Sequence, residues 1–197
     1  MKSANIVIAS EIKQKSVIDM GLTFTAMIRL FEKGTKPIIG KKLYEEFQKL
    51  KEIRTEEEFK RLHGNFCIWF TKNIKTAQKE RDNRIIKESG YALYGHAAKL
   101  LDVVLKVYVY YSSLPDSETA VVILPFMNTA IDNPILNHLK IKFPDEIIQA
   151  KSVEQIDQKL YDKLQCLIKT EINNEFNNDI IPTQYDDIMW YRLNRDT

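Results

Sequence analysis

Residues 91–111, YALYGHAAKLLDVVLKVYVYY, form the most hydrophobic stretch of the chain and decide the predicted fold. Polar side chains recur in this stretch at spacings of three, three and four residues, at His96, Lys99, Asp102 and Lys106. At 3.6 residues per turn, these positions form one narrow polar stripe on an otherwise apolar helix. A helix of this kind lies at the centre of a bundle, so the stretch predicts an all-α fold wrapped around residues 91–111.

Amphipathic segments on both sides of this stretch supply the surrounding helices. Apolar residues recur at helical spacing over residues 19–33, 41–52, 56–82, 153–176 and 183–193, and Pro134 can open a short helix to His138 or Leu139. The segments Thr55–Glu58 and Ser152–Gln155 each have the form of a capping box, and Gly34 stands where a left-handed helix cap is expected. Because the chain has no repeat and no Pro/Ser-rich linker, we expect a single helical domain over residues 1–197.

One region leaves an alternative open. Val107–Tyr111 and residues 120–124 are rich in β-branched and aromatic side chains, and a turn-like Pro115-Asp116 separates them. These runs could pair as a hairpin, which would make the fold α+β with one hairpin near residues 105–125. The polar stripe that begins at His96 continues into the first run, which favours a helix there.

Composition excludes several classes of protein. Apolar residues make up 44% and charged residues 28% of the 197 residues, which argues against a disordered chain and against a membrane protein. The longest uncharged run, residues 119–131, is shorter than the ~20 residues of a membrane-spanning helix and is interrupted by Pro125 and Asn128. The two cysteines, Cys67 and Cys166, make a disulfide framework implausible, so we expect a reducing, cytoplasmic location.

Charge is divided unevenly along the chain. Residues 1–106 hold 21 Lys/Arg against 13 Asp/Glu, a net charge of +8, whereas residues 107–197 hold 8 against 14, a net charge of −6. A basic first half is typical of a protein with an anionic partner. Two surfaces of opposite charge that attract each other, within a monomer or between subunits, would give the same division.

Basic residues are the candidates for nucleic-acid binding. On a helix over residues 56–82, Arg61, Lys72, Lys75 and Lys79 share the side opposite the Phe/Trp stripe, where lysines could contact successive phosphates. We expect Lys72, Lys75 and Lys79 to bind phosphates, with Lys99 and Lys106 nearby. The alternative is an ordinary solvated helix face, because base-stacking aromatic residues are not interleaved with these lysines.

The polar stripe of residues 91–111 supplies the candidate catalytic residues His96, Lys99 and Asp102. In a cleft, His96 would titrate near neutral pH, and Lys99 or Lys106 could hold an anionic group. The alternative is that the stripe is merely the edge of the central helix that reaches water. Because no P-loop, GxGxxG, HExxH, GxSxG or CxxC pattern occurs, the sequence names no reaction.

Acidic residues in the second half suggest a metal site. Glu171 and Glu175 lie one turn apart and could hold Mg²⁺ or Ca²⁺ together with Asp132 or Asp179. A divalent cation so bound would make the protein a metal-assisted hydrolase. The same carboxylates could equally be surface or dimer-contact charges.

The segment Tyr94–Leu101, YGHAAKLL, which continues to Lys106, and the segment Ile131–Leu136, IDNPIL, carry a resemblance. Together they resemble short uncharacterised bacterial proteins that are all-helical and whose topology has been likened to that of nucleic-acid-processing proteins. The resemblance implies that the Gly-x-Ala-x-Lys segment opens the central helix and that the Asp-x-x-Ile-Leu segment packs against it. It implies His96, Lys99 and Asp132 as shared positions.

Two classes of function follow from these signals. The first is a helical module that binds or processes nucleic acid through its basic first half. The second is a non-catalytic interaction protein, a homodimer that buries its acidic second half and the aromatic residues Tyr185, Trp190 and Tyr191 at an interface.

Overall fold

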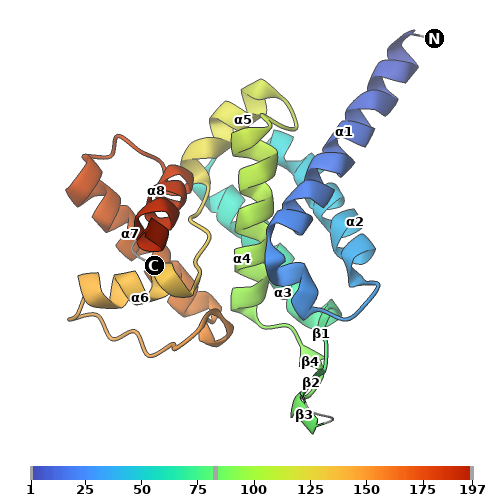
Figure 1. Ribbon diagram of the computed structural model, residues 1–197. Coiled ribbons are helices and arrows are strands. Elements are labelled where there is room, and N and C mark those ends of the chain that lie inside the picture. The colour runs from blue at the N-terminus through green and yellow to red at the C-terminus, as the bar shows by residue number, and fades with distance from the viewer. Residues whose placement is uncertain (1, 82–83, 196–197) are drawn as a thin grey trace.

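The structure, a computed structural model, is all-α and describes residues 2–81 and 84–195 (Figure 1). The α-helices are α1 (Lys2–Phe24), α2 (Thr35–Gln48), α3 (Glu56–Asn73), α4 (Tyr94–Leu105), α5 (Ser117–Ile123), α6 (Asn133–Lys142), α7 (Gln158–Phe176) and α8 (Pro182–Arg195). Four short 3₁₀ helices lie in the connections among the described residues: η1 (Ala26–Leu30), η2 (Lys49–Glu52), η4 (Leu124–Phe126) and η5 (Val153–Gln155). Figure 1 shows α4 in the middle, with α1, α2 and α3 on one side and α6, α7 and α8 on the other. The predicted all-α class and central helix are therefore confirmed.

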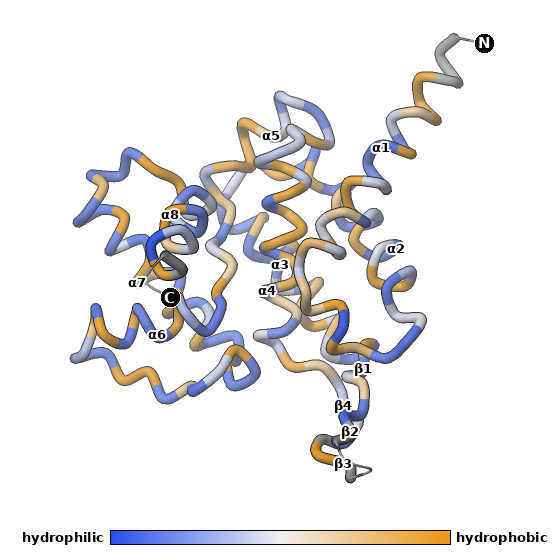
Figure 2. The backbone as a smooth tube through the Cα atoms, in the orientation of Figure 1, coloured by the Kyte–Doolittle hydropathy of each residue, from blue (hydrophilic) through white to orange (hydrophobic). Residues whose placement is uncertain are grey.

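Helix α1 begins far before the predicted start at residue 19, and its N-terminal end extends beyond the other helices (Figure 1). Hydrophobic residues occur along its whole length, including the projecting part (Figure 2). The end of the helix predicted over residues 19–33 also differs, because α1 ends at Phe24 and η1 at Leu30. Gly34 does adopt the expected left-handed conformation, with φ of 88°, but it directly precedes α2, which begins before the predicted start at residue 41. Within the described residues, each helix is too short or too polar to cross a lipid bilayer.

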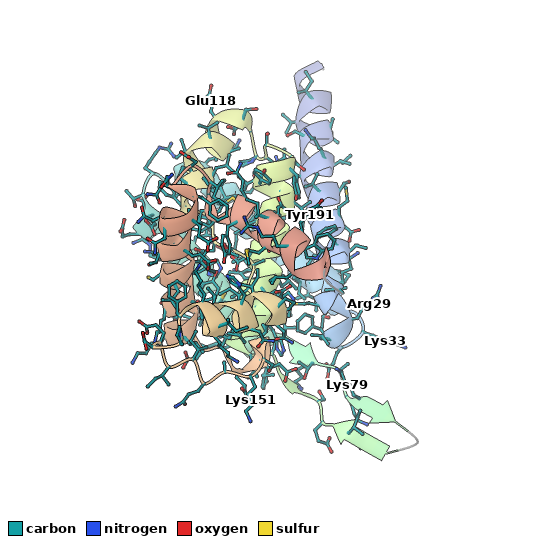
Figure 3. The ribbon with its side chains drawn as sticks, turned by 60° about the vertical axis from the view of Figure 1, so that its left-hand side comes forward. Arg29, Lys33, Lys79, Glu118, Lys151 and Tyr191 are labelled. Atoms are coloured by element: carbon teal, nitrogen blue, oxygen red, sulfur yellow. The ribbon has the colours of Figure 1, made fainter. Side chains whose placement is uncertain are left out.

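A small β-hairpin replaces the last third of the helix predicted over residues 56–82. Helix α3 opens at the predicted capping box but ends at Asn73, because the β-branched Ile74 has an extended backbone. Four short strands follow and pair antiparallel as β1 with β4 and β2 with β3, in the order β1 (Lys75–Thr76), β2 (Lys79–Arg81), β3 (Arg84–Lys87) and β4 (Gly90–Tyr91). The hairpin stands off the helical body (Figure 3). The predicted helix end at Asp82 lies outside the described residues.

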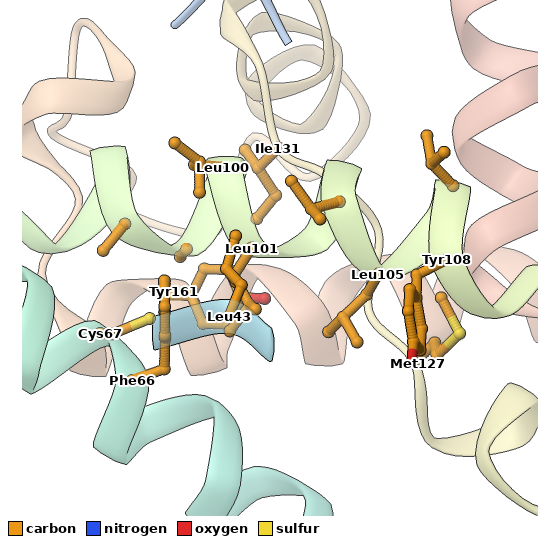
Figure 4. Packing of buried hydrophobic residues seen from close by; sticks show 14 of the residues in the cluster. Leu43, Phe66, Cys67, Leu100, Leu101, Leu105, Tyr108, Met127, Ile131 and Tyr161 are labelled. Atoms are coloured by element: carbon orange, nitrogen blue, oxygen red, sulfur yellow. The ribbon is translucent and has the colours of Figure 1, made fainter. Parts of the chain in front are cut away.

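The core surrounds α4 and extends through the chain from Val17 to Met189. Leu100 points to one side of α4, and Leu101 and Leu105 point to the other (Figure 4); all three side chains are buried. Helix α1 crosses α4 closely at Gly21, where a Cβ atom would lie 3.1 Å from the Val104 Cα atom. Of the two polar sites described below, one lies around the buried Asp102 of α4 and the other at the N-terminal end of this helix.

The alternative hairpin near residues 105–125 is wrong. Lys106–Tyr111 continues α4 as a π-helical turn, η3, and the second run is α5, whose first turn is capped by the Asp116 side chain. The first run, Val107–Tyr111, is helical and not a strand because Val107, Tyr108 and Val109 are all buried against the core. A half-exposed hairpin would leave part of them in contact with solvent.

The second half of the chain forms the remaining helices. Asp132 caps α6 by accepting a hydrogen bond from the Ile135 N–H at 2.9 Å, with Pro134 in the first turn as expected. The predicted capping box at Ser152 opens only the turn η5, and α7 begins later, behind an Asp157 cap. Helix α7 contacts both α6 and α8.

Candidate functional site

A closed polar cluster lies at the centre of the bundle, where α3, α4 and α7 meet. His63 Nε2 lies 3.0 Å from Asp102 Oδ1, and the Tyr161 hydroxyl donates to Asp102 Oδ2 at 2.8 Å. The rings of His63 and Tyr161 stack with an interplanar angle of 15°. All three residues are buried, so their polar atoms are satisfied by one another rather than by water.

Burial and neighbouring charges shift the pKa values of the residues in the closed cluster. Burial opposes the charged form of His63, but the Cys67 sulfur and the Asp102 carboxylate outweigh it and raise the pKa of His63 to about 10. Burial, with Asp102 close by, raises the pKa of the Tyr161 hydroxyl, which keeps that group protonated and able to donate. The cluster is therefore a protonated histidine and a phenol arranged around one carboxylate.

Cys67 extends the closed cluster to a chain of sulfur, imidazole and carboxylate, since its Sγ lies 3.7 Å from His63 Nδ1. A nucleophilic triad uses these groups in this order. However, Cys67 has 0% exposed surface, so a substrate has no path to its sulfur. The geometry therefore supports a structural role for the closed cluster.

A pocket of about 240 Å³ lies beside the closed cluster. It is lined by Lys60, His63, Tyr94, Asn128, Gln158, Tyr161, Asp162, Gln165, Cys166 and Lys169. Lys60 and Lys169 both form ion pairs with Glu56, at 3.0 and 2.5 Å. The cations of this pocket are thus already compensated by a carboxylate of the same chain.

A second site is an open groove at the N-terminal end of α4, on the side of η5. It has a volume of about 290 Å³ and is lined by Met27, Leu30, His96, Lys99, Asp132, Asn133, Pro134, Ser152, Val153 and Glu154. A narrower cleft shares Leu30, His96 and Glu154 with it and extends to Thr76, Ala77 and Lys79 on the hairpin. We call the two together the basic groove. It brings together His96, Lys99 and Asp132, the three positions that the resemblance implies.

Gly95 makes the basic groove possible. Its N–H donates to the Ile156 carbonyl at 3.0 Å, and a Cβ atom on Gly95 would lie only 2.0 Å from the Val153 carbonyl oxygen. Since no side chain fits in that space, η5 packs directly on the first turn of α4. This contact holds the Glu154 carboxylate 3.5 Å from His96 Nε2, while His96 Nδ1 accepts from the Leu93 N–H.

Two cations line the basic groove, and three more lie close in sequence to its lining residues. Lys79 and Lys99 line it, Arg29 adjoins the lining residue Leu30, Lys151 adjoins Ser152, and Lys33 follows η1. Figure 3 shows Arg29, Lys33, Lys79 and Lys151 at the same end of the molecule. Lys99 is half-buried, and the other four side chains are exposed. Over the described ranges, none of the five forms an ion pair, in contrast to the lysines of the other pocket.

The other predicted phosphate-binding lysines are dispersed. Lys72 is exposed on the last turn of α3, and Lys75 lies on β1 with its Nζ over the Tyr91 ring, 5.6 Å from the ring centroid. The expected single helix face of Lys72, Lys75 and Lys79 was wrong, because α3 ends before two of them. Lys106 is buried at the other end of α4, where it forms ion pairs with Asp186 and Asp187 at 2.6 and 2.5 Å.

The predicted metal ligands have other partners. Glu171 is buried and accepts from the Tyr185 hydroxyl at 2.9 Å, with His138 Nε2 at 2.7 Å from its second oxygen. Glu175 pairs with Lys142 and, at 3.5 Å, with Arg192. In the part of the chain that the structure describes, no three His, Cys, Asp or Glu side chains are grouped as metal ligands. The divalent cation stays a prediction.

Sequence reasoning named Asp102 but missed its partners His63 and Tyr161. A signal for His63 was present, since it stands on α3 between the buried Leu62 and Phe66, where a polar side chain needs a partner. Arg29 and Lys33 were missed because they fell within the helix predicted over residues 19–33, and Lys151 was missed because it lies in a loop without periodicity.

Comparison with known proteins found no matching family model, no matching curated protein and no matching solved structure. Function has to be inferred from the side chains of the protein itself.

Proposed function

We propose that the protein binds nucleic acid by its phosphate backbone along the basic groove. The observation that carries this proposal is that Lys79 and Lys99 line one groove, that Arg29, Lys33 and Lys151 follow or adjoin its lining segments, and that among the described residues none of the five forms an ion pair. Like charges gathered without compensation repel one another, which favours the binding of a polyanion that releases its counterions.

The acidic residues of the basic groove limit how a backbone can lie. Glu154 and Asp132 face the same groove as His96, so an anion deep in the groove would meet two carboxylates. Lys79 lines only the narrower cleft, and Lys151 and Arg29 are not among the lining residues of the groove. A phosphate backbone therefore follows the rim, which gives contacts that position a strand without reading its bases.

The cysteines are compatible with this proposal. Cys67 and Cys166 are both free, which agrees with a reducing compartment, and we propose the cytoplasm, where nucleic acids are available.

The test is fluorescence anisotropy with labelled single-stranded and duplex oligonucleotides, at 50 and 200 mM salt. If three of the cations contact duplex phosphates, the logarithmic salt slope is about −2.7, and this increase in salt weakens binding by about 40-fold. Replacement of Lys79, Lys99 or Lys151 by Ala reduces the slope by about 0.9 each.

Lys13→Ala is the matched control, because Lys13 is an exposed lysine on α1 that lines neither part of the basic groove. Two results would count against the proposal. One is the absence of binding at 50 mM salt, and the other is a set of groove variants that behave like the Lys13 variant.

A further inference from the structure

Helix α1 is apolar on two opposite sides. Its inner side packs on the core through Val17, Ile18 and Leu22, which are at most 9% exposed. Away from this side, α1 also carries Ile8, Ile12, Met20 and Phe24, which are 54%, 59%, 62% and 74% exposed and alternate with charged residues such as Lys13 and Asp19. Large apolar side chains exposed together often mark an interaction surface. These four residues of α1 therefore call for a partner.

The outer apolar residues form a single ridge. Ile8, Ile12, Met20 and Phe24 are spaced by multiples of four, and the exposed Ser16 occupies the position in the middle. At 100° per residue, Ser16 points about 160° away from Ile18 and about 120° away from Leu22, so the middle of the ridge faces outward from the body. Ridges of residues four apart are the elements that interlock when two helices cross at about −50°.

The outer ridge is symmetric about the small residue Ser16. Two large apolar residues, Ile8 and Ile12, precede it, and two more, Met20 and Phe24, follow it at the same spacing. Self-complementarity of this kind is what a two-fold contact between identical chains requires. A small residue at the crossing point lets the two backbones approach. The projection of α1 beyond the other helices leaves its outer side open to a second helix (Figure 1).

We infer that α1 is a dimerisation surface that binds a second copy of this chain. The two α1 helices cross antiparallel with Ser16 at the two-fold axis. Ile12 of each copy then packs against Met20 of the other, and Ile8 packs against Phe24. Two crossing helices bury little surface compared with a permanent interface, so the dimer is a micromolar one.

This surface differs from the dimer contact that the C-terminal aromatic residues suggest. Tyr185 is buried and hydrogen-bonded to Glu171, so it is not available to a partner. Trp190 and Tyr191 are exposed by 63% and 50% on α8, but they lack the two-way symmetry of the outer ridge.

Cysteine cross-linking tests the inferred geometry. In a Cys166→Ser background, which removes the exposed native thiol, Ser16→Cys is expected to give a disulfide-linked dimer under mild oxidation. Glu118→Cys, at an exposed position on α5, is the matched control and is expected to stay monomeric. Adding Ile12→Asp to Ser16→Cys is expected to abolish the cross-link without loss of helix content, because Ile12 is not part of the core.

Sedimentation of the unmodified protein up to concentrations on the order of 100 µM complements the cross-linking. A dimer that Ile12→Asp converts to a monomer supports the inference. A monomer at every concentration overturns it, and so does a dimer that Ile12→Asp leaves intact with no Ser16→Cys cross-link. Binding of the monomer to vesicles of anionic lipid through α1 would likewise overturn it, in favour of a membrane-surface role.

Discussion

The closed cluster and the basic groove contain similar residues around α4, but the first is closed to solvent and the second is open to it. Both place a histidine beside a carboxylate at α4. In the closed cluster, the His63 and Asp102 side chains are 3% and 0% exposed, and Tyr161 supplies the remaining donor. In the basic groove, His96 and Glu154 share the lining with Lys79 and Lys99, which form no ion pair among the described residues. Polar groups that satisfy one another hold helices together, whereas charges left uncompensated at a surface are available to a ligand.

The largest expected effect is on the closed cluster. Asp102→Ala leaves a protonated, buried His63 without its counter-charge and is expected to lower the free energy of unfolding by about 3–5 kcal/mol. Urea denaturation measures the change. Asp162→Ala, an exposed aspartate on the nearby α7, is the control and is expected to change stability by less than about 0.5 kcal/mol. Equal effects of the two variants would remove the basis for the comparison.

Loss of one hydroxyl should have a smaller effect. Tyr161→Phe deprives Asp102 Oδ2 of its donor and is expected to cost about 1.5–3 kcal/mol, because the acceptor is charged. Tyr185→Phe should act similarly, since Tyr185 donates to the buried Glu171. Tyr110→Phe is the control, because the half-buried Tyr110 makes no hydroxyl hydrogen bond among the described residues. A Tyr161→Phe variant as stable as Tyr110→Phe would mean that water replaces the hydroxyl.

Stability should also depend on pH through His63. Its pKa is raised from 6.5 to about 10 in the folded protein, so the folded state holds a proton that the unfolded state has lost between these values. The stabilisation is complete below pH 6.5 and disappears as the pH rises through about 10, with a slope of at most about 1.4 kcal/mol per pH unit from this group. Urea denaturation from pH 6 to 10 measures the slope. In His63→Gln the slope should flatten, and an unchanged slope would assign it to other groups.

Sequence periodicity was sufficient for the helices and their caps but not for contacts between distant elements. The capping box of α3 was predictable, since Thr55 and Glu58 exchange their hydrogen bonds at 3.2 and 3.1 Å within one turn. The closed cluster was not, because Tyr161 lies 98 residues from His63 and periodicity gives only the face on which a side chain lies. The hairpin was missed because the lysines from Lys72 to Lys79 continue the helical spacing beyond Asn73.

The basic groove was predictable in part. His96 and Lys99 belong to the polar stripe of the central helix, and the resemblance adds Asp132. The stripe itself is split by the structure, because Asp102 points into the closed cluster and Lys106 binds the carboxylates of α8. Side chains on one helix face meet different neighbours along its length, and only the tertiary structure fixes which ones.

The most direct test of the central claim, that the basic groove binds and the closed cluster stabilises, is a comparison of binding and stability in the Lys79→Glu, Lys99→Glu double variant. Because both lysines lack ion-pair partners among the described residues, the variant should unfold within about 0.5 kcal/mol of the native protein. Its anisotropy titration at 50 mM salt should show binding to an oligonucleotide lost or weakened by more than about tenfold. Native-like affinity in a stably folded double variant would contradict the account.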